Sequence, residues 1–126
     1  MQTARNITFY CSLVLCSLVL LGCGKKADVS KPLSEVKAEA DKMTAEQLRS
    51  TAMTYKDAVT AKQGEVEKIA AKLKAIPVAE MLSSKAKDLK AEVDNLNKSL
   101  SALKERFEVY YQKLKEKGGD LSGLTI

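Results

Sequence analysis

The side chains in this sequence that first suggest chemistry are carboxylates, lysines and three cysteines. The chain contains no histidine. Carboxylates recur four residues apart at Glu35 and Glu39 and again at Asp88 and Glu92, a spacing that places both members of a pair on one helix face. Such a pair could offer oxygen ligands to a divalent cation. No carboxylate-rich loop completes a ligand shell around either pair, so the pattern favours an ordinary charged helix surface.

The absence of histidine also limits the reactions that this chain could catalyse. Histidine is the usual general acid or base near neutral pH and the commonest ligand of zinc. Histidine-based catalysis and the common zinc sites are therefore excluded. No other set of residues resembles a catalytic constellation. We therefore expect a protein that is not an enzyme, with no catalytic residue, metal site, cofactor or small-molecule substrate.

One cysteine, Cys23, stands directly after a long apolar run. Residues 7–21 are apolar or weakly polar, and Arg5 is the only charged residue before them. Such a run suits the core of a signal peptide and is shorter than the roughly 20 residues of a membrane-spanning helix. The run ends in Leu20-Leu21-Gly22-Cys23, with leucine three residues and a small residue one residue before the cysteine. This pattern resembles the lipobox of bacterial lipoprotein precursors.

The resemblance implies that residues 1–22 are a signal peptide, that cleavage precedes Cys23, and that acyl chains such as palmitate modify the Cys23 thiol. Two or more acyl chains anchor a protein stably, whereas one holds it only marginally. The expected location is the cell envelope, and the glycine at position 24 favours the periplasmic side of the outer membrane. The outer face of the cytoplasmic membrane is the alternative location. An uncleaved anchor helix with an incidental cysteine is the alternative interpretation of the same residues.

Cleavage before Cys23 would also simplify the composition of the mature chain. Cys11 and Cys16 would be lost and Cys23 would carry lipid, so no disulfide could stabilise the fold. Removal of residues 1–22 takes away Arg5 and no acid, which leaves 20 basic and 16 acidic residues. The lysines are interspersed with acids, so the small positive excess predicts a solvated helix surface. We expect no nucleic-acid partner in this compartment.

The residues after Cys23 predict a short polar tether over 23–31 and then a helix. Ser30 can cap a helix, and Pro32 is tolerated in its first turn. A capping-box pattern follows at Thr44 and Gln47. The first helix could therefore run unbroken from residue 32 to 76, or a separate short N-terminal helix could end before Thr44.

Two long apolar seams carry the fold prediction. Their apolar residues recur at alternating steps of four and three, which is the 3.5-residue period of a coiled coil, and the first seam is interrupted only at Lys62. The first seam contains Leu48, Ala52, Tyr55, Val59, Lys62, Val66, Ile69, Leu73 and Ile76, and the second contains Leu82, Ala86, Leu89, Val93, Leu96, Leu100, Leu103, Phe107, Tyr110 and Leu114.

The break between the seams lies at Ile76-Pro77, because proline disfavours helical angles in the residue before it. The prediction is an all-α fold in which residues 32–117 form a long antiparallel, coiled-coil-like hairpin with its turn near residue 77. Gly118 and Gly119 end the second helix, and residues 118–126 form a flexible C-terminal tail. Lys62 could fix the register of the seam or direct its ammonium group outward, and its long stem favours the second.

A two-helix hairpin buries only a narrow stripe, and the simplest register places like charges together, including Glu65 near Glu92. Residues 31–43 could therefore fold back as a third helix, or two hairpins could associate. The expected function is that of a non-catalytic, membrane-anchored lipoprotein whose hairpin contacts an envelope protein or a second copy. The alternatives are a holdase-like periplasmic chaperone and an accessory subunit of an envelope complex.

Overall fold

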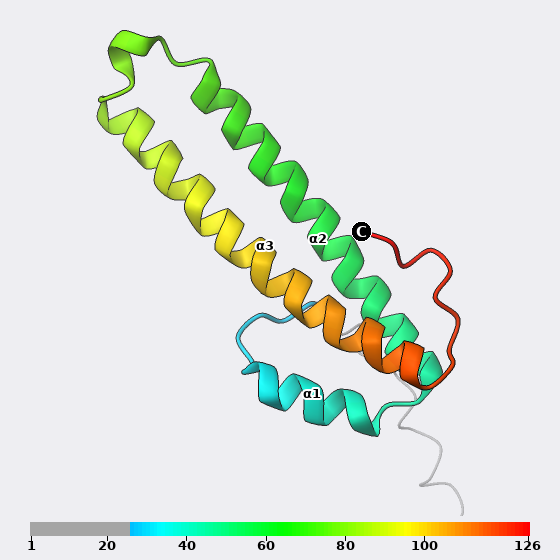
Figure 1. Ribbon diagram of the computed structural model, residues 1–126. Coiled ribbons are helices and arrows are strands. Elements are labelled where there is room, and N and C mark those ends of the chain that lie inside the picture. The colour runs from blue at the N-terminus through cyan, green and yellow to red at the C-terminus, as the bar shows by residue number, and fades with distance from the viewer. Residues whose placement is uncertain (1–25) are drawn as a thin grey trace, which may run out of the picture.

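The computed structural model describes residues 26–126, which contain helices and loops and no strand. The helices are α1 (Leu33–Lys42), α2 (Ala45–Lys74), the short 3-10 helix η1 (Val78–Glu80) and α3 (Ser84–Glu116). Helices α2 and α3 lie side by side as an antiparallel hairpin, and α1 packs across α3 at the end farthest from the turn (Figure 1). The predicted all-α fold with a long helical hairpin is confirmed.

The hairpin does not begin at residue 32, because α1 and α2 are separate helices. Met43 between them is extended, with φ −78° and ψ 147°. The Thr44 Oγ1 atom accepts from the backbone N–H of Gln47 at 3.3 Å, and the Gln47 side chain accepts from the Thr44 N–H at 3.0 Å. This capping box starts a new helix at Ala45, so the alternative of a separate short N-terminal helix is confirmed.

The start of α1 differs from the prediction. Pro32 occupies the N-cap position and no side chain caps the helix. Ser30 instead donates from its N–H and its hydroxyl to the Asp28 carboxylate, at 2.8 and 2.6 Å. The prediction of Ser30 as the cap is therefore wrong, because α1 begins at Leu33 and the N-cap position falls on Pro32, two residues after Ser30.

The turn of the hairpin lies at Pro77, as predicted, but it is longer than a tight connection. Pro77 precedes η1, and α3 begins only at Ser84. The Ser83 hydroxyl accepts from the N–H of Ala86 at 3.3 Å and so caps α3. This cap marks the start of α3 at Ser84, seven residues after Pro77.

The end of α3 is a Schellman motif. The N–H of Gly119 donates to the carbonyl of Leu114, and the N–H of Gly118 donates to the carbonyl of Lys115, both at 3.0 Å. Gly118 has a φ of 65°, a left-handed conformation that glycine adopts without steric cost. The two glycines therefore end the helix as predicted, and they turn the chain back toward α2.

The segment after Gly119 was predicted to be a flexible tail, but it is packed. Leu124 is 1% exposed and belongs to the core, and Leu121 packs against that core. Arg49 and Lys56 on α2 donate to the carbonyls of Ser122 and Gly123. The sequence pattern missed this because the two leucines lie beyond the glycines that end α3, and two residues are too few to define a period.

The hydrophobic core is concentrated at the end of the hairpin where α1 and the tail lie. Its fully buried side chains come from α1, α2, α3 and the tail: Val36, Ala40, Leu48, Ala52, Tyr55, Val59, Leu103, Phe107, Tyr110, Leu114 and Leu124. We call this end of the molecule, with its surrounding segments, the base. Phe107 and Tyr110 are buried as the seam predicts, and Tyr111 stacks on Phe107 with ring centroids 5.7 Å apart.

The packed tail leads to a stability prediction. Replacement of Leu124 by Ala should lower the free energy of unfolding by about 2–4 kcal/mol, because it removes a fully buried side chain and leaves a cavity. Chemical denaturation followed by circular dichroism measures this change. Ile126→Ala is the matched control, since Ile126 is 51% exposed. Equal effects of the two substitutions would show that the tail does not contribute to the core.

Candidate functional site

The part of the hairpin beyond the base has an incompletely covered apolar surface. We call this part, residues 60–100, the arm. Among the arm residues, all of which the structure describes, Ala86 alone is fully buried. Other apolar seam residues of the arm are half-buried, and we call six of them the apolar stripe: Val66, Ile69, Leu73, Leu89, Val93 and Leu96.

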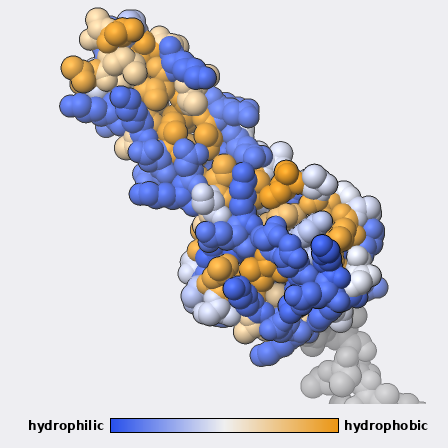
Figure 2. All heavy atoms as spheres, viewed as in Figure 1, coloured by the Kyte–Doolittle hydropathy of each residue, from blue (hydrophilic) through white to orange (hydrophobic). Residues whose placement is uncertain are grey.

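The stripe continues to the tip of the arm. Val78 is 90% exposed and Leu82 is 83% exposed. Figure 2 shows apolar residues running from the tip along the arm between hydrophilic flanks. A contiguous apolar surface of this kind, bordered by polar residues, is typical of an interaction site rather than of a solvated helix face.

The difference between arm and base follows from the number of covering elements. At the base, α1 packs on α3, and the tail is bonded to α2, so the seam is enclosed. On the arm, α2 and α3 lie side by side, and α1 lies at the other end of the hairpin (Figure 1). Two helices bury a narrow stripe between them, and the outer edge of each apolar side chain stays open to solvent.

Lys62 lies where the arm meets the base. Its side chain is 27% exposed, and its Nζ atom lies 2.7 Å from a carboxylate oxygen of Glu65. The ammonium group therefore reaches the surface along its aliphatic stem, as predicted. Glu65 is the residue that the simplest register placed near Glu92, and its bond to Lys62 reduces that repulsion.

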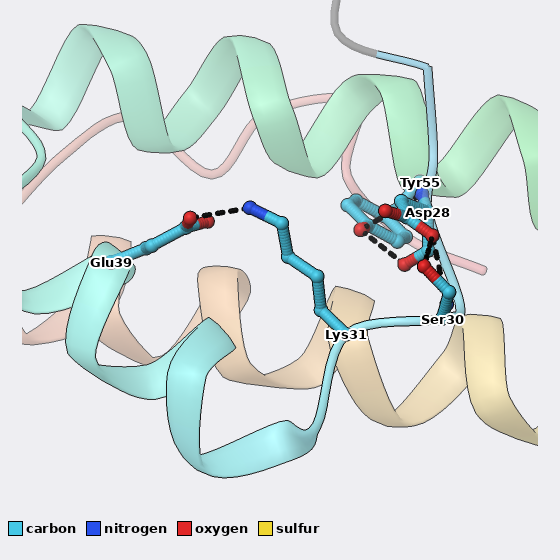
Figure 3. A network of polar contacts seen from close by, with 5 residues as sticks. All are labelled: Asp28, Ser30, Lys31, Glu39 and Tyr55. Carbon is cyan, nitrogen blue, oxygen red and sulfur yellow. Dashed lines mark hydrogen bonds and ion pairs between the residues drawn. The ribbon is translucent and has the colours of Figure 1, made fainter.

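At the base, two side chains hold the segment that precedes α1. The Tyr55 hydroxyl donates to the carbonyl of Asp28 at 2.9 Å and accepts from the N–H of Asp28 at 3.1 Å (Figure 3). The Arg106 guanidinium, which is 7% exposed, donates to the carbonyls of Val29 and Lys31 and, on its own helix, of Ala102. The chain is therefore fixed to the hairpin from Asp28 onward.

This attachment changes the predicted tether. Residues 23–31 were expected to be a polar tether, but Ala27 packs against the core and Asp28 is bonded. Only residues 24–27 separate Cys23 from the first bonded residue. A lipid on Cys23 would consequently keep the base close to the membrane surface.

Two further polar contacts stabilise this segment. Ser30 donates two hydrogen bonds to Asp28, and these hold the pKa of the Asp28 carboxyl below its usual value. Lys31 pairs with Glu39 on α1, which raises the pKa of Lys31 (Figure 3). Glu39 is thus engaged in an ion pair rather than in a carboxylate pair with Glu35.

An open hollow of about 300 Å³ lies between α1 and α3. Within it the Lys113 ammonium lies 2.7 Å from Asp41 and 2.6 Å from Glu116. The two carboxylates raise the pKa of Lys113, and Lys113 in turn lowers the pKa of Asp41. The ion pair between Lys113 on α3 and Asp41 on α1 joins the two helices.

The second predicted carboxylate pair, Asp88 and Glu92, is not part of a larger cluster of metal-ligating groups within residues 26–126. Asp88 and Glu92 are exposed on the outer surface of α3. Within residues 26–126, no group of three or more histidine, cysteine, aspartate or glutamate side chains could hold a metal ion. Cys23, the predicted lipidation site, lies outside the described residues, as does the predicted signal peptide over 1–22.

Sequence reasoning missed the contribution of Arg106. Arg106 follows Leu103 by three residues and precedes Tyr110 by four, so it shares their helix face. That spacing was a usable signal, because a charged residue on a core face requires partners. The partners themselves were not visible, since they are backbone carbonyls 75 and 77 residues away.

No helix in the described part of the chain has the length and apolar character needed to cross a membrane. Comparisons of the chain with protein-family models, with curated proteins and with solved structures find no match. No relative therefore supplies a function for the arm or for the base.

The bonds of Tyr55 can be tested by removing its hydroxyl. Tyr55→Phe should lower the free energy of unfolding by about 1–2 kcal/mol, because the N–H and the carbonyl of Asp28 both lose a partner. Limited proteolysis should also cut the segment before Pro32 faster in this variant. Tyr111→Phe is the control, since no hydrogen bond to its hydroxyl is present among the described residues. Unchanged proteolysis in Tyr55→Phe would contradict the attachment.

Tyr110 predicts a pH dependence. Burial raises the pKa of Tyr110 to about 12 from an ordinary value of 10.0, and its ring stacks on Tyr55 at 5.3 Å. The Tyr110 hydroxyl thus loses its proton at a lower pH in the unfolded chain than in the folded chain. The stability that Tyr110 contributes is therefore fully present below pH 10 and is lost as the pH rises to 12. Chemical denaturation at a series of pH values should show that this effect lowers the free energy of unfolding by about 2–3 kcal/mol between pH 10 and pH 12. Tyr110→Phe should remove this part of the loss, and an unchanged pH profile in that variant would contradict the assignment.

Proposed function

We propose that this chain is a non-catalytic, lipid-anchored protein of a bacterial cell envelope that uses its helical arm to contact another protein. The observation that carries the proposal is the apolar stripe of the arm, which no described segment of the chain covers. The base has a closed core of its own and needs no partner. The molecule thus separates a self-sufficient base from an arm whose apolar surface needs one.

The lipobox supplies the second part of the proposal. Leu20-Leu21-Gly22-Cys23 is the pattern expected of a precursor that is cleaved and acylated at Cys23. The hydrogen bonds of Tyr55 and Arg106 hold Asp28 and Val29, which follow this cysteine by five and six residues, at the base. An anchor there would hold the base at the membrane and leave the tip of the arm at the opposite end of α2 and α3, about 45–50 Å away.

Metabolic labelling with an alkyne analogue of palmitate tests the anchor. The chain should take up the label and sediment with membranes, whereas Cys23→Ser should lose the label because it has no thiol to acylate. Cys16→Ser is the matched control and should keep the label, since Cys16 would leave with the signal peptide. A chain that remains unlabelled, or a Cys23→Ser variant that keeps its label, would contradict lipidation at Cys23.

A second candidate function is that of a holdase-like chaperone, and the same apolar stripe favours it. A surface that binds unfolded proteins must expose apolar side chains, as Val78 and Leu82 do. The two functions differ in their partners, because a holdase suppresses aggregation of many unrelated unfolded proteins. Suppression of aggregation by the chain, and its loss on Val66→Glu with Val93→Glu, would support the holdase. No suppression at equimolar ratio would leave the interaction module as the function.

A further inference from the structure

The charges of the arm are sorted along its length. Residues 68–91, which we call the tip band, contain six lysines and two acids and have a net charge of +4. Residues 63–67 and 92–97, which we call the acidic band, contain four acids and no basic residue and have a net charge of −4. The lysines of the tip band are Lys68, Lys72, Lys74, Lys85, Lys87 and Lys90, and the acids of the acidic band are Glu65, Glu67, Glu92 and Asp94.

The charges of the two bands are largely unpaired within one chain. Among the ion pairs of residues 26–126, none includes a lysine of the tip band. The acidic band takes part in one pair, between Lys62 and Glu65. Both bands flank the apolar stripe, whose residues Val66, Val93 and Leu96 lie within the acidic band. A partner that covers the stripe would meet both bands.

The charge bands of two copies of the arm are complementary when the two arms lie antiparallel. The centres of the two bands lie about 10 Å apart along the arm at 1.5 Å per residue. Two antiparallel arms can therefore overlap so that each tip band lies over the acidic band of the other copy. Two-fold symmetry makes this contact twice, whereas parallel arms would place like bands together.

We propose that the partner of the apolar stripe is a second copy of this chain, whose arm lies antiparallel so that the two hairpins form a four-helix bundle. Such a bundle buries the seam of each hairpin against the other. Charged residues beside a seam select partner and orientation, which is the role assigned to the two bands. The inference rests on the proposed function in treating the arm as the contact surface, but it does not require lipid on Cys23. Because the two bases lie at opposite ends of the bundle, two lipid-anchored copies would have to lie along one membrane or join two membranes.

Charge reversal tests the orientation. Lys72→Glu with Lys87→Glu reverses the tip band, and Glu67→Lys with Asp94→Lys reverses the acidic band; all four side chains are exposed, so the fold should survive. Sedimentation of the full chain in a non-ionic detergent at low salt gives the dimer dissociation constant. Each reversal alone should raise this constant about tenfold or more, because four ion pairs become repulsions. The combination of all four substitutions should restore it to within about threefold.

A chain that stays monomeric at about 100 μM would overturn the proposal, since a functional contact should be occupied at that concentration. Failure of the combined variant to recover would overturn the antiparallel orientation. Binding of the monomeric chain to vesicles of anionic lipid that is lost on Val66→Glu with Val93→Glu would overturn it as well and would assign the stripe to a membrane surface. Retained palmitate labelling in any of these cases would leave the proposed anchor intact.

Crosslinking gives a second measurement that does not depend on the charge variants. Ala70 lies near the boundary of the two bands, so the proposed two-fold axis brings both copies of this residue together. Ala79 lies at the tip, about 20 Å from its counterpart in the antiparallel overlap. A short bismaleimide should therefore link Ala70→Cys into a dimer and leave Ala79→Cys monomeric, with the parent chain as the control for Cys11, Cys16 and Cys23. The reverse result would overturn the proposal.

Discussion

The structure depends on one constraint: two helices packed together can bury only a narrow stripe of each other. At the base this constraint is met by added layers, since α1 covers α3 and the tail after Gly119 places Leu124 in the core. On the arm no described segment adds such a layer, and Val66, Val93 and Leu96 remain half-buried. The same seam therefore acts as a core at one end and as an open surface at the other.

The base is closed by polar contacts as well as by apolar packing. Tyr55 and Arg106 project from the two hairpin helices and bond to the backbone of the segment before α1. Buried donors of this kind need partners, and the backbone carbonyls of Val29 and Lys31 accept from one terminal nitrogen of the Arg106 guanidinium, whereas its Nε atom has no partner among the described residues. Anchoring of the chain near residue 28 is thus a consequence of core packing and not of a separate binding site.

The separation of base and arm connects the fold with the proposals. A closed base can sit at a membrane without exposing its core, and a projecting arm can present an apolar surface to a partner. The charge bands then determine which orientation of partner is favourable, because apolar contact alone has little directional preference. In these proposals, stability and recognition therefore reside in different halves of one helical hairpin.

Much of the fold was predictable from local patterns. The 3.5-residue seams identified α2 and α3, the capping box at Thr44 marked the start of α2, and Pro77 and Gly118 marked the turn and the end of α3. These signals operate within a few residues of each other, through helical periodicity, capping and the restricted backbone of proline.

Other features of the fold were decided only by the tertiary structure, because they depend on contacts between residues that are distant in the sequence. The packing of Leu124, the role of Arg106 and the open state of the arm each depend on which segments fold over the hairpin. Leu124 lies beyond the glycines that end α3, and the partners of Arg106 are backbone atoms 75 and 77 residues away. The sequence by itself determined the helices and the lipobox pattern at Cys23, because both are encoded locally. The three-dimensional fold decided where the seam is covered, because burial is a property of the whole packed chain.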